Sequence, residues 1–235
     1  MRLIEPSVTR VEETGIKLVE LAARNCFQSV PKPEGNTKEF VLALAKSNHF
    51  APLEFAKYWS ERKSDFDGRV YDLRHILERR DSEEYSDLID KLESLEHASE
   101  EYPCFKITTS LQVANELVRH RRFSFCQEST RYCNYSKEKF GGLTFVLPPT
   151  LDKGKKMYLV DSLALEERIY LDAIEDHHYT AQEAAMFLPK QTATTIYMQG
   201  HKTDWIYFLD LRYFEITGKV LPEMKHIATL IKEQL

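Results

Sequence analysis

The chain lacks long apolar runs. No apolar run in its 235 residues approaches the roughly 18 residues that a membrane-spanning helix needs. The first residues, Met1–Pro6, also lack the long apolar segment of a secretory signal peptide. These absences predict a protein that works in the cytoplasm and does not enter a membrane.

Cysteine is scarce and is not arranged for metal binding. The 4 cysteines form no CxxC pair and no His-x₃-His sequence accompanies them, so no metal site is expected. In a chain of this length without a secretion signal, reduced thiols are expected rather than a disulfide framework. Cys126 and Cys133 lie near arginines, which could activate a thiol as a nucleophile. No histidine and acid are placed beside either thiol, so this is the weaker hypothesis.

The common catalytic motifs are missing as well. The sequence contains no GxSxG elbow, P-loop, GxGxxG or HExxH. A net charge of −5 argues against a general nucleic-acid-binding protein, because such binding depends on cations that face phosphates. The exception is the basic stretch, residues 119–132, in which five of fourteen residues are Arg or His. Cations gathered against the global charge predict an anion site, and a solvated basic helix end is the simpler alternative.

Hydrophobic periodicity predicts an α+β fold without a βαβ rhythm. Helices are expected at 14–27, 37–48, 111–121, 161–177, about 203–212 and from 222 onward. Short strands are expected at 55–60, 102–110, 143–147 and 194–199. The chain is predicted to be a single catalytic domain, residues 1–235, with a charged, mainly helical insertion at about 61–101. Nothing in the insertion indicates chemistry.

Three of the expected helices begin with capping signals. Thr37 is expected to cap the helix at 37–48, and Thr180 begins a Thr-x-x-Glu capping box. Thr203 or Asp204 is expected to cap the aromatic-rich helix that ends near Arg212.

The basic stretch is expected to begin in the last turn of the helix at 111–121. On a helix, Arg119 and Arg121 would point roughly 200° apart, so one small anion would not contact both unless it wrapped the helix end. Two ligands, or one site shared between subunits, fit that geometry better. Ser124, Gln127 and Ser129 follow and can orient a polar ligand. The stretch therefore suits phosphates and a heterocycle, and a cofactor would supply the difficult chemistry.

The spacing within the basic stretch resembles a family signature. Arg119-His120-Arg121-x-x-Ser124-x₄-Ser129-x-Arg131-Tyr132 is similar to the RHRxxSxxxxSxRY sequence of flavin-dependent thymidylate synthases. Smaller similarities to this family cover most of the chain: AARxCF at 22–27, HxxPLE at 49–54, LP at 188–189 and FLxLR at 208–212. Only the insertion lies outside the common pattern.

The resemblance implies the fold of the thymidylate-synthase-complementing proteins, an α+β fold with helices around a central, mostly antiparallel sheet. It also implies a homotetramer whose active sites are built from several subunits. The implied reaction is the reductive methylation of dUMP to dTMP. Methylenetetrahydrofolate would give the carbon, NADPH would reduce FAD, and the flavin would pass a hydride to the pyrimidine. Neither a cysteine nucleophile nor a nucleic-acid partner is implied.

The resemblance also assigns roles to matching positions. The residues expected to line the FAD site are His49, Glu54, Arg119, His120, Arg121, His201 and Tyr207. Those expected to bind dUMP are Arg119, Gln127, Glu128, Ser129, Arg131 and Arg212, with Arg131 on the phosphate. Arginine suits such tasks because it stays charged and can bind phosphate through two parallel hydrogen bonds. Ser129 and Arg212 are the expected catalytic residues, and Arg212 would stabilise negative charge that develops on the uracil.

Several positions depart from the family pattern. Ala185 stands where the family often has Arg, His201 where it often has Asn, and Leu221 begins Leu-Pro-Glu in place of His-Pro-Gln. Ala51 and Phe55 replace a Ser or Thr and a second His in the turn at 49–55. A flavoenzyme that modifies another pyrimidine nucleotide, or transfers another one-carbon unit, is therefore the first alternative. A non-enzymatic module that binds RNA or nucleotides through the basic stretch is the second.

Overall fold

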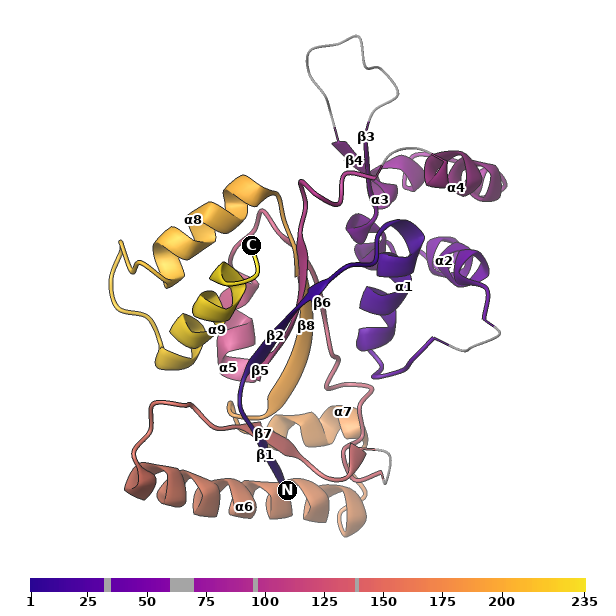
Figure 1. Ribbon diagram of the computed structural model, residues 1–235. Coiled ribbons are helices and arrows are strands. Elements are labelled where there is room, and N and C mark those ends of the chain that lie inside the picture. Colours follow the sequence, from indigo (N-terminus) through magenta and orange to yellow (C-terminus); the bar gives the residue numbers. More distant parts are fainter. Residues whose placement is uncertain (32–34, 60–69, 95–96, 138–139) are drawn as a thin grey trace.

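A four-stranded antiparallel sheet forms the centre of the computed structural model, which describes residues 1–31, 35–59, 70–94, 97–137 and 140–235 (Figure 1). Its strand order is β2-β5-β8-β6. These strands are β2 (Ser7–Val11), β5 (Cys104–Ser110), β8 (Ala193–Gln199) and β6 (Ser124–Gln127). Two smaller sheets pair β1 (Arg2–Ile4) with β7 (Thr144–Val146) in parallel and β3 (Lys57–Trp59) with β4 (Val70–Asp72) in antiparallel.

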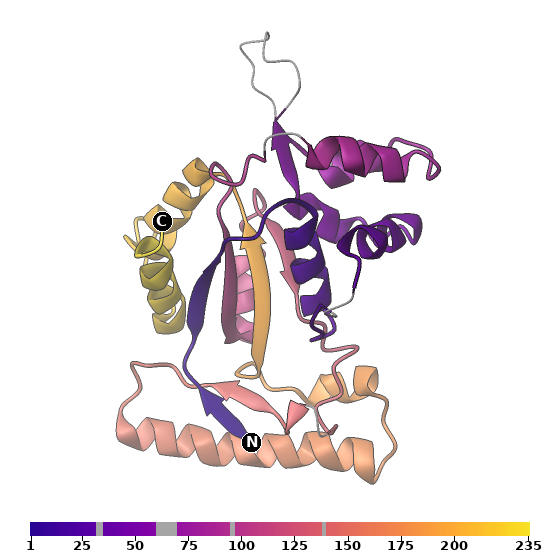
Figure 2. The same ribbon diagram turned by 45° about the vertical axis from the view of Figure 1, so that its right-hand side comes forward.

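Helices cover both faces of the central sheet, as Figures 1 and 2 show. One face carries α5 (Leu111–Leu117), α8 (Lys202–Arg212) and α9 (Pro222–Lys232). The other carries α1 (Gly15–Asn25), with α2 (Thr37–Lys46), α3 (Leu73–Leu77) and α4 (Tyr85–Glu93) outside it. At one end of the sheet, α6 (Lys153–Glu175) and α7 (Ala181–Ala184) flank β1 and β7. The expected α+β fold with an antiparallel sheet is confirmed.

The central strands bury both of their faces. Because successive side chains of a strand point to opposite sides, Cys104 of β5 joins the cluster around α1 while Phe105 joins the cluster around α8 and α9. On β8, Tyr197 lies in the first cluster and Met198 in the second. A third cluster packs α6 and α7 against Phe145 of β7. Within the described residues, no helix is both long and apolar enough to cross a membrane.

Helix starts differ from expectation at three places. Asn36, not Thr37, caps α2, because its side chain accepts a hydrogen bond from Glu39 N at 3.3 Å. His201, and neither Thr203 nor Asp204, caps α8. The third helix, α6, begins at Lys153 rather than at residue 161, behind an aspartate cap. The capping box at Thr180 is confirmed; the short helix it opens continues as the 3₁₀ turn η3 (Ala185–Phe187).

The basic stretch is not helical, contrary to expectation. The helix α5 ends at Leu117, residues 118–123 form turns, and the chain then enters β6, a strand that the sequence pattern did not predict. Phe123 is buried, 8% exposed, with its ring 4.5 Å from that of Trp205. Because α5 ends before Arg119, the helical geometry from which a 200° divergence of Arg119 and Arg121 was predicted does not apply.

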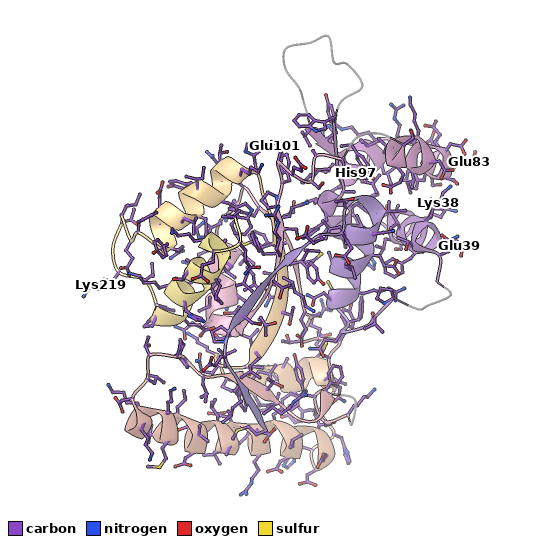
Figure 3. The ribbon with its side chains drawn as sticks, in the orientation of Figure 1. Lys38, Glu39, Glu83, His97, Glu101 and Lys219 are labelled. Carbon is purple, nitrogen blue, oxygen red and sulfur yellow. The ribbon has the colours of Figure 1, made fainter. Side chains whose placement is uncertain are left out.

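The inserted segment is part of the core rather than peripheral. Five of its buried side chains pack in one cluster with residues of α1 and α2: Leu73, Leu77, Tyr85, Ile89 and Leu92. Val70 belongs to a strand, where a helical pattern was expected. Outside this core, Lys38 of α2 pairs with Asp90 of α4 at 2.6 Å, while Glu39 and Glu83 lie on the outer surface (Figure 3). Residues 61–69 and 95–96 of the expected insertion, and residue 60 of the strand expected at 55–60, lie outside the described residues.

Candidate functional site

The basic stretch borders a cavity of about 400 Å³ beside α8. Its lining residues are Arg119, His120, Arg121, Arg122, Phe123, Asp204, Tyr207, Leu211 and Arg212. Five of the expected site residues therefore surround one space, including both arginines that a helix would have separated. We call this space the arginine cavity.

Two of its arginines are available to a ligand. Arg122, whose side chain is 78% exposed, pairs with Asp204 of α8 at 3.1 Å. Arg119 and Arg121 are exposed, and within the described residues neither has an acidic side chain in ion-pair contact. An anion that enters the arginine cavity would meet these two guanidinium groups first.

Arg212 is held by two neighbours at the cavity wall. Its Nε donates to Nε2 of His120 at 3.1 Å, and Nη1 donates to Oε2 of Glu116 at 3.4 Å. Burial, and then the charge of Arg212, lower the pKa of His120 to about 4, so the imidazole is neutral near pH 7. Glu116 was not expected at the site; its position one turn before the basic stretch was the only sequence signal.

The second half of the signature lies at the other end of β6. Gln127 Nε2 donates to Thr194 Oγ1 at 3.3 Å, and Ser129 N donates to the Cys26 carbonyl at 3.0 Å. Glu128 is buried and accepts a 2.6 Å hydrogen bond from the hydroxyl of Tyr135. Glu128 borders a polar cavity of about 110 Å³, whose lining also includes Tyr135, Thr108, Thr194 and Thr195. Gln127 and Ser129 do not line it.

Arg131 lies at the surface next to aromatic rings. Its Nη2 is 3.4 Å from Oε1 of Gln182 on α7, and its guanidinium carbon is 5.8 Å from the centroid of the Tyr132 ring. Tyr132 in turn lies 4.8 Å from Phe27, centroid to centroid, and both rings are largely exposed. The guanidinium is thus accessible to a phosphate.

Three expected cofactor residues lie away from the arginine cavity. His49 is exposed at the end of α2, and Glu54 lies in the 3₁₀ turn η1 (Ala51–Phe55), where it pairs with Arg74 at 2.6 Å. His201 accepts from Thr203 N at 3.2 Å as the cap of α8 and lies 3.6 Å from Glu101. One chain therefore does not gather all the expected residues. Within the described part of the chain, no group of three or more His, Cys, Asp or Glu is placed to hold a metal ion.

A helix-covered antiparallel sheet with an arginine-lined cavity at one side defines the protein as a member of the α+β class. The model of the family described as thymidylate synthase complementing protein matches residues 61–235. The chain belongs to this family, as its signature predicted.

Curated relatives resemble the chain over most of its length. The probable flavin-dependent thymidylate synthase of Mycobacterium phage L5 is 26% identical over 239 residues, covering 90% of this chain and 77% of the relative. The corresponding protein of Mycobacterium phage D29 is 26% identical over 246 residues, covering 95% and 83%. The flavin-dependent thymidylate synthase of Mycobacterium sp. (strain JLS) is 27% identical over 223 residues, covering 86% and 70%.

Two solved structures share the fold. The UMP/dUMP methylase PolB from Streptomyces cacaoi, bound with 5-Br UMP, is similar with a TM-score of 0.54 and 16% identity, covering 100% of this chain and 90% of that one. Its structure bound with 5-Br dUMP gives a TM-score of 0.53 and 16% identity, covering 100% and 92%. At this identity the similarity establishes the fold alone.

Proposed function

We propose that the protein is a flavin-dependent thymidylate synthase that converts dUMP to dTMP by reductive methylation. The observation that carries the proposal is the arginine cavity, which unites Arg119, His120 and Arg121 of the signature with Tyr207 and Arg212 of α8. The names of the curated relatives support it, as does the nucleotide-methylase activity in the names of the similar structures.

The residues around the arginine cavity fit a flavin nucleotide. The guanidinium groups of Arg119 and Arg121 suit its phosphates, and the half-exposed ring of Tyr207 offers a flat apolar surface. His49, Glu54 and His201 lie away from this cavity in one chain, so in this proposal they would complete the site from another subunit. When bound, FAD would supply the hydride that reduces the pyrimidine-bound carbon, with NADPH and methylenetetrahydrofolate as co-substrates.

In this proposal, the nucleotide binds to the second half of the signature. Arg131 would bind the phosphate of dUMP, while Gln127, Glu128 and Ser129 would orient the nucleoside. Arg212 would stabilise negative charge on the uracil. The neutral imidazole of His120 accepts from Nε of Arg212 and so orients the guanidinium, which keeps other N–H groups for the ring oxygen.

The separation of these residues within one chain supports active sites shared between subunits. Arg119 and Arg131 lie beyond opposite ends of β6, a four-residue strand that spans about 13 Å at 3.3 Å per residue. Arg212 belongs to the arginine cavity rather than to the end that holds Arg131. A homotetramer, working in the cytoplasm, would bring the two ends from different subunits to one substrate.

The proposal is tested with purified protein that has been loaded with FAD. Anaerobic NADPH should bleach the flavin absorbance, and dTMP should form only when dUMP, methylenetetrahydrofolate and NADPH are all present. R212M should abolish product while retaining flavin. A protein that binds no flavin, and instead binds RNA with a steep salt dependence, would contradict the proposal and favour the nucleic-acid-binding alternative.

A second candidate is a flavoenzyme that acts on another pyrimidine nucleotide. It is favoured by Ala185, which lies one helical turn after Gln182, the residue that contacts Arg131. A family arginine at this position would supply a second cation near the phosphate, and this chain lacks it. Parallel assays with dUMP and UMP decide between the candidates, because the main proposal requires a higher kcat/KM for dUMP.

A further inference from the structure

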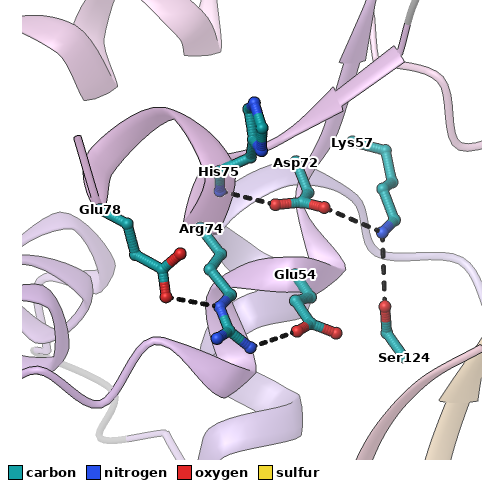
Figure 4. A network of polar contacts seen from close by, with 7 residues as sticks. All are labelled: Glu54, Lys57, Asp72, Arg74, His75, Glu78 and Ser124. Atoms are coloured by element: carbon teal, nitrogen blue, oxygen red, sulfur yellow. Dashed lines mark hydrogen bonds and ion pairs between the residues drawn. The ribbon is translucent and has the colours of Figure 1, made fainter.

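Arg74, a residue of the inserted segment, contacts the turn that carries Glu54 (Figure 4). Its Nη1 lies 2.6 Å from Glu54 Oε1, and its Nε lies 2.7 Å from Glu78 Oε1. The guanidinium is therefore held between a carboxylate of its own helix and a carboxylate of the 3₁₀ turn. Glu54 is one of the residues assigned to the flavin.

The backbone around Arg74 is fixed relative to that turn. Leu73 N donates to the carbonyl of Ala56 at 3.0 Å, which ties the first residue of α3 to the end of the turn. Asp72 caps α3 by accepting from His75 N at 2.8 Å. Leu73 and Leu77 are both 0% exposed, so α3 is anchored on either side of Arg74. An anchored arginine can set the orientation of its partner, whereas a mobile surface arginine would not.

A second set of contacts links the same segment to the signature through Lys57 of β3. Lys57 Nζ lies 3.7 Å from Asp72 Oδ2 and 3.3 Å from Oγ of Ser124, the first serine of the signature. Burial lowers the pKa of Lys57, and its carboxylate neighbours partly offset that effect. The strand and helix at 70–78 thus contact the turn that carries Glu54 directly, and they reach Ser124, the first residue of β6, only through Lys57 of β3.

The charged side chains around Arg74 and Lys57 argue, by their balance of charge, against a separate phosphate site. This cluster contains two cations, Lys57 and Arg74, and three carboxylates, those of Glu54, Asp72 and Glu78 (Figure 4). Each cation already faces a carboxylate within 4.0 Å. A phosphate would have to displace an acid that is already in place, so the cluster orients side chains rather than binding an anion.

We propose that Arg74 is a positioning residue of the flavin site, which holds the Glu54 carboxylate in the orientation that binds the cofactor. This inference rests on the proposed function and gives the insertion a role within it. In this role Arg74 would act on the cofactor only through Glu54.

The role of Arg74 is tested by measuring the affinity for FAD. FAD is added to the 235-residue protein, and the change in protein fluorescence is followed. R74M should weaken FAD binding by up to about fivefold, because the Arg74–Glu54 pair is partly exposed to solvent. R74K should recover part of the loss. R79M, at an exposed arginine just beyond the same helix, is the matched control and should bind as the parent does. The flavin-free R74M protein should unfold no more than about 2–4 °C below R79M, the shift expected for the loss of a partly exposed charge pair.

A double-mutant cycle tests whether Arg74 acts through Glu54. In an E54Q background, R74M should cause no further loss of FAD affinity. The inference would be overturned if R74M reduced FAD affinity equally in the parent and in the E54Q background. It would also be overturned if R74M bound FAD as tightly as the parent protein does. A parent protein that binds no FAD would instead overturn the proposed function and this inference together.

Discussion

Replacing Gly200 with alanine should destabilise the fold and weaken ligand binding in the arginine cavity. Gly200 lies between β8 and α8, and an added Cβ would overlap the ring of Phe123. That ring cannot move freely, because it is 4.5 Å from the ring of Trp205 and 6.4 Å from that of Phe208, and both partners are fully buried. Overpacking of this kind costs about 1–3 kcal/mol.

The expected fall in melting temperature of G200A follows from the length of the chain. For about 235 residues, a loss of about 2 kcal/mol should lower the melting temperature by roughly 4–8 °C. Phe123 directly follows residues 119–122, so its displacement should also shift the arginines of the cavity and weaken FAD binding. Thermal unfolding and flavin titration measure the two effects separately.

The matched control is G154A in α6. There the atom nearest to an added Cβ is Asp152 Oδ1, at 3.5 Å, an ordinary contact distance, and alanine should increase stability by up to about 1 kcal/mol. In G200A, the further change F123L should restore part of the stability, because leucine is smaller than the ring. A G200A protein as stable as G154A, with unchanged flavin affinity, would refute this account of the cavity wall.

Three further predictions follow from named contacts. Because the pKa of His120 falls from 6.5 to about 4 on folding, the stability gained from its neutral form is complete above about pH 6.5 and lost as the pH falls through 4. The free energy of unfolding in urea should therefore differ less between pH 7 and pH 4.5 in H120Q than in the parent protein. R131A should raise the dissociation constant of dUMP about ten- to hundredfold by calorimetry, while R168A on α6 should not. E223A should cost about 3 kcal/mol in urea unfolding, because the buried carboxylate accepts from Thr109 Oγ1 at 2.6 Å, Ser110 N at 2.8 Å and Ser110 Oγ at 2.9 Å.

The elements with strong local signals were predictable. α1 and α9 carry apolar residues at helical spacing, and β5 and β8 are rich in β-branched residues, so each was expected close to its observed position. β2 and β6 were not expected. β6 is a four-residue strand that exists through its pairing with β8, about seventy residues later, and such non-local pairing leaves little trace in a short segment.

The site was predictable as a set of residues but not as a geometry. The signature identified Arg119, His120 and Arg121, yet their shared cavity depends on a turn that forms because Phe123 is buried against α8. Glu116 and Arg74 carry no motif, and their roles come from contacts with residues 96 and 20 positions away. Tertiary contacts of this kind are set by the fold and cannot be read from local spacing.

The most direct test of the central claim is the fate of dUMP labelled with tritium at carbon 5. Thymidylate synthesis replaces that hydrogen with the new methyl group, so the FAD-loaded protein with NADPH and methylenetetrahydrofolate should release tritium and form an equal amount of dTMP. R212M should release no tritium and form no dTMP under the same conditions. Reduced flavin that persists beside unchanged dUMP, with no tritium released, would contradict it.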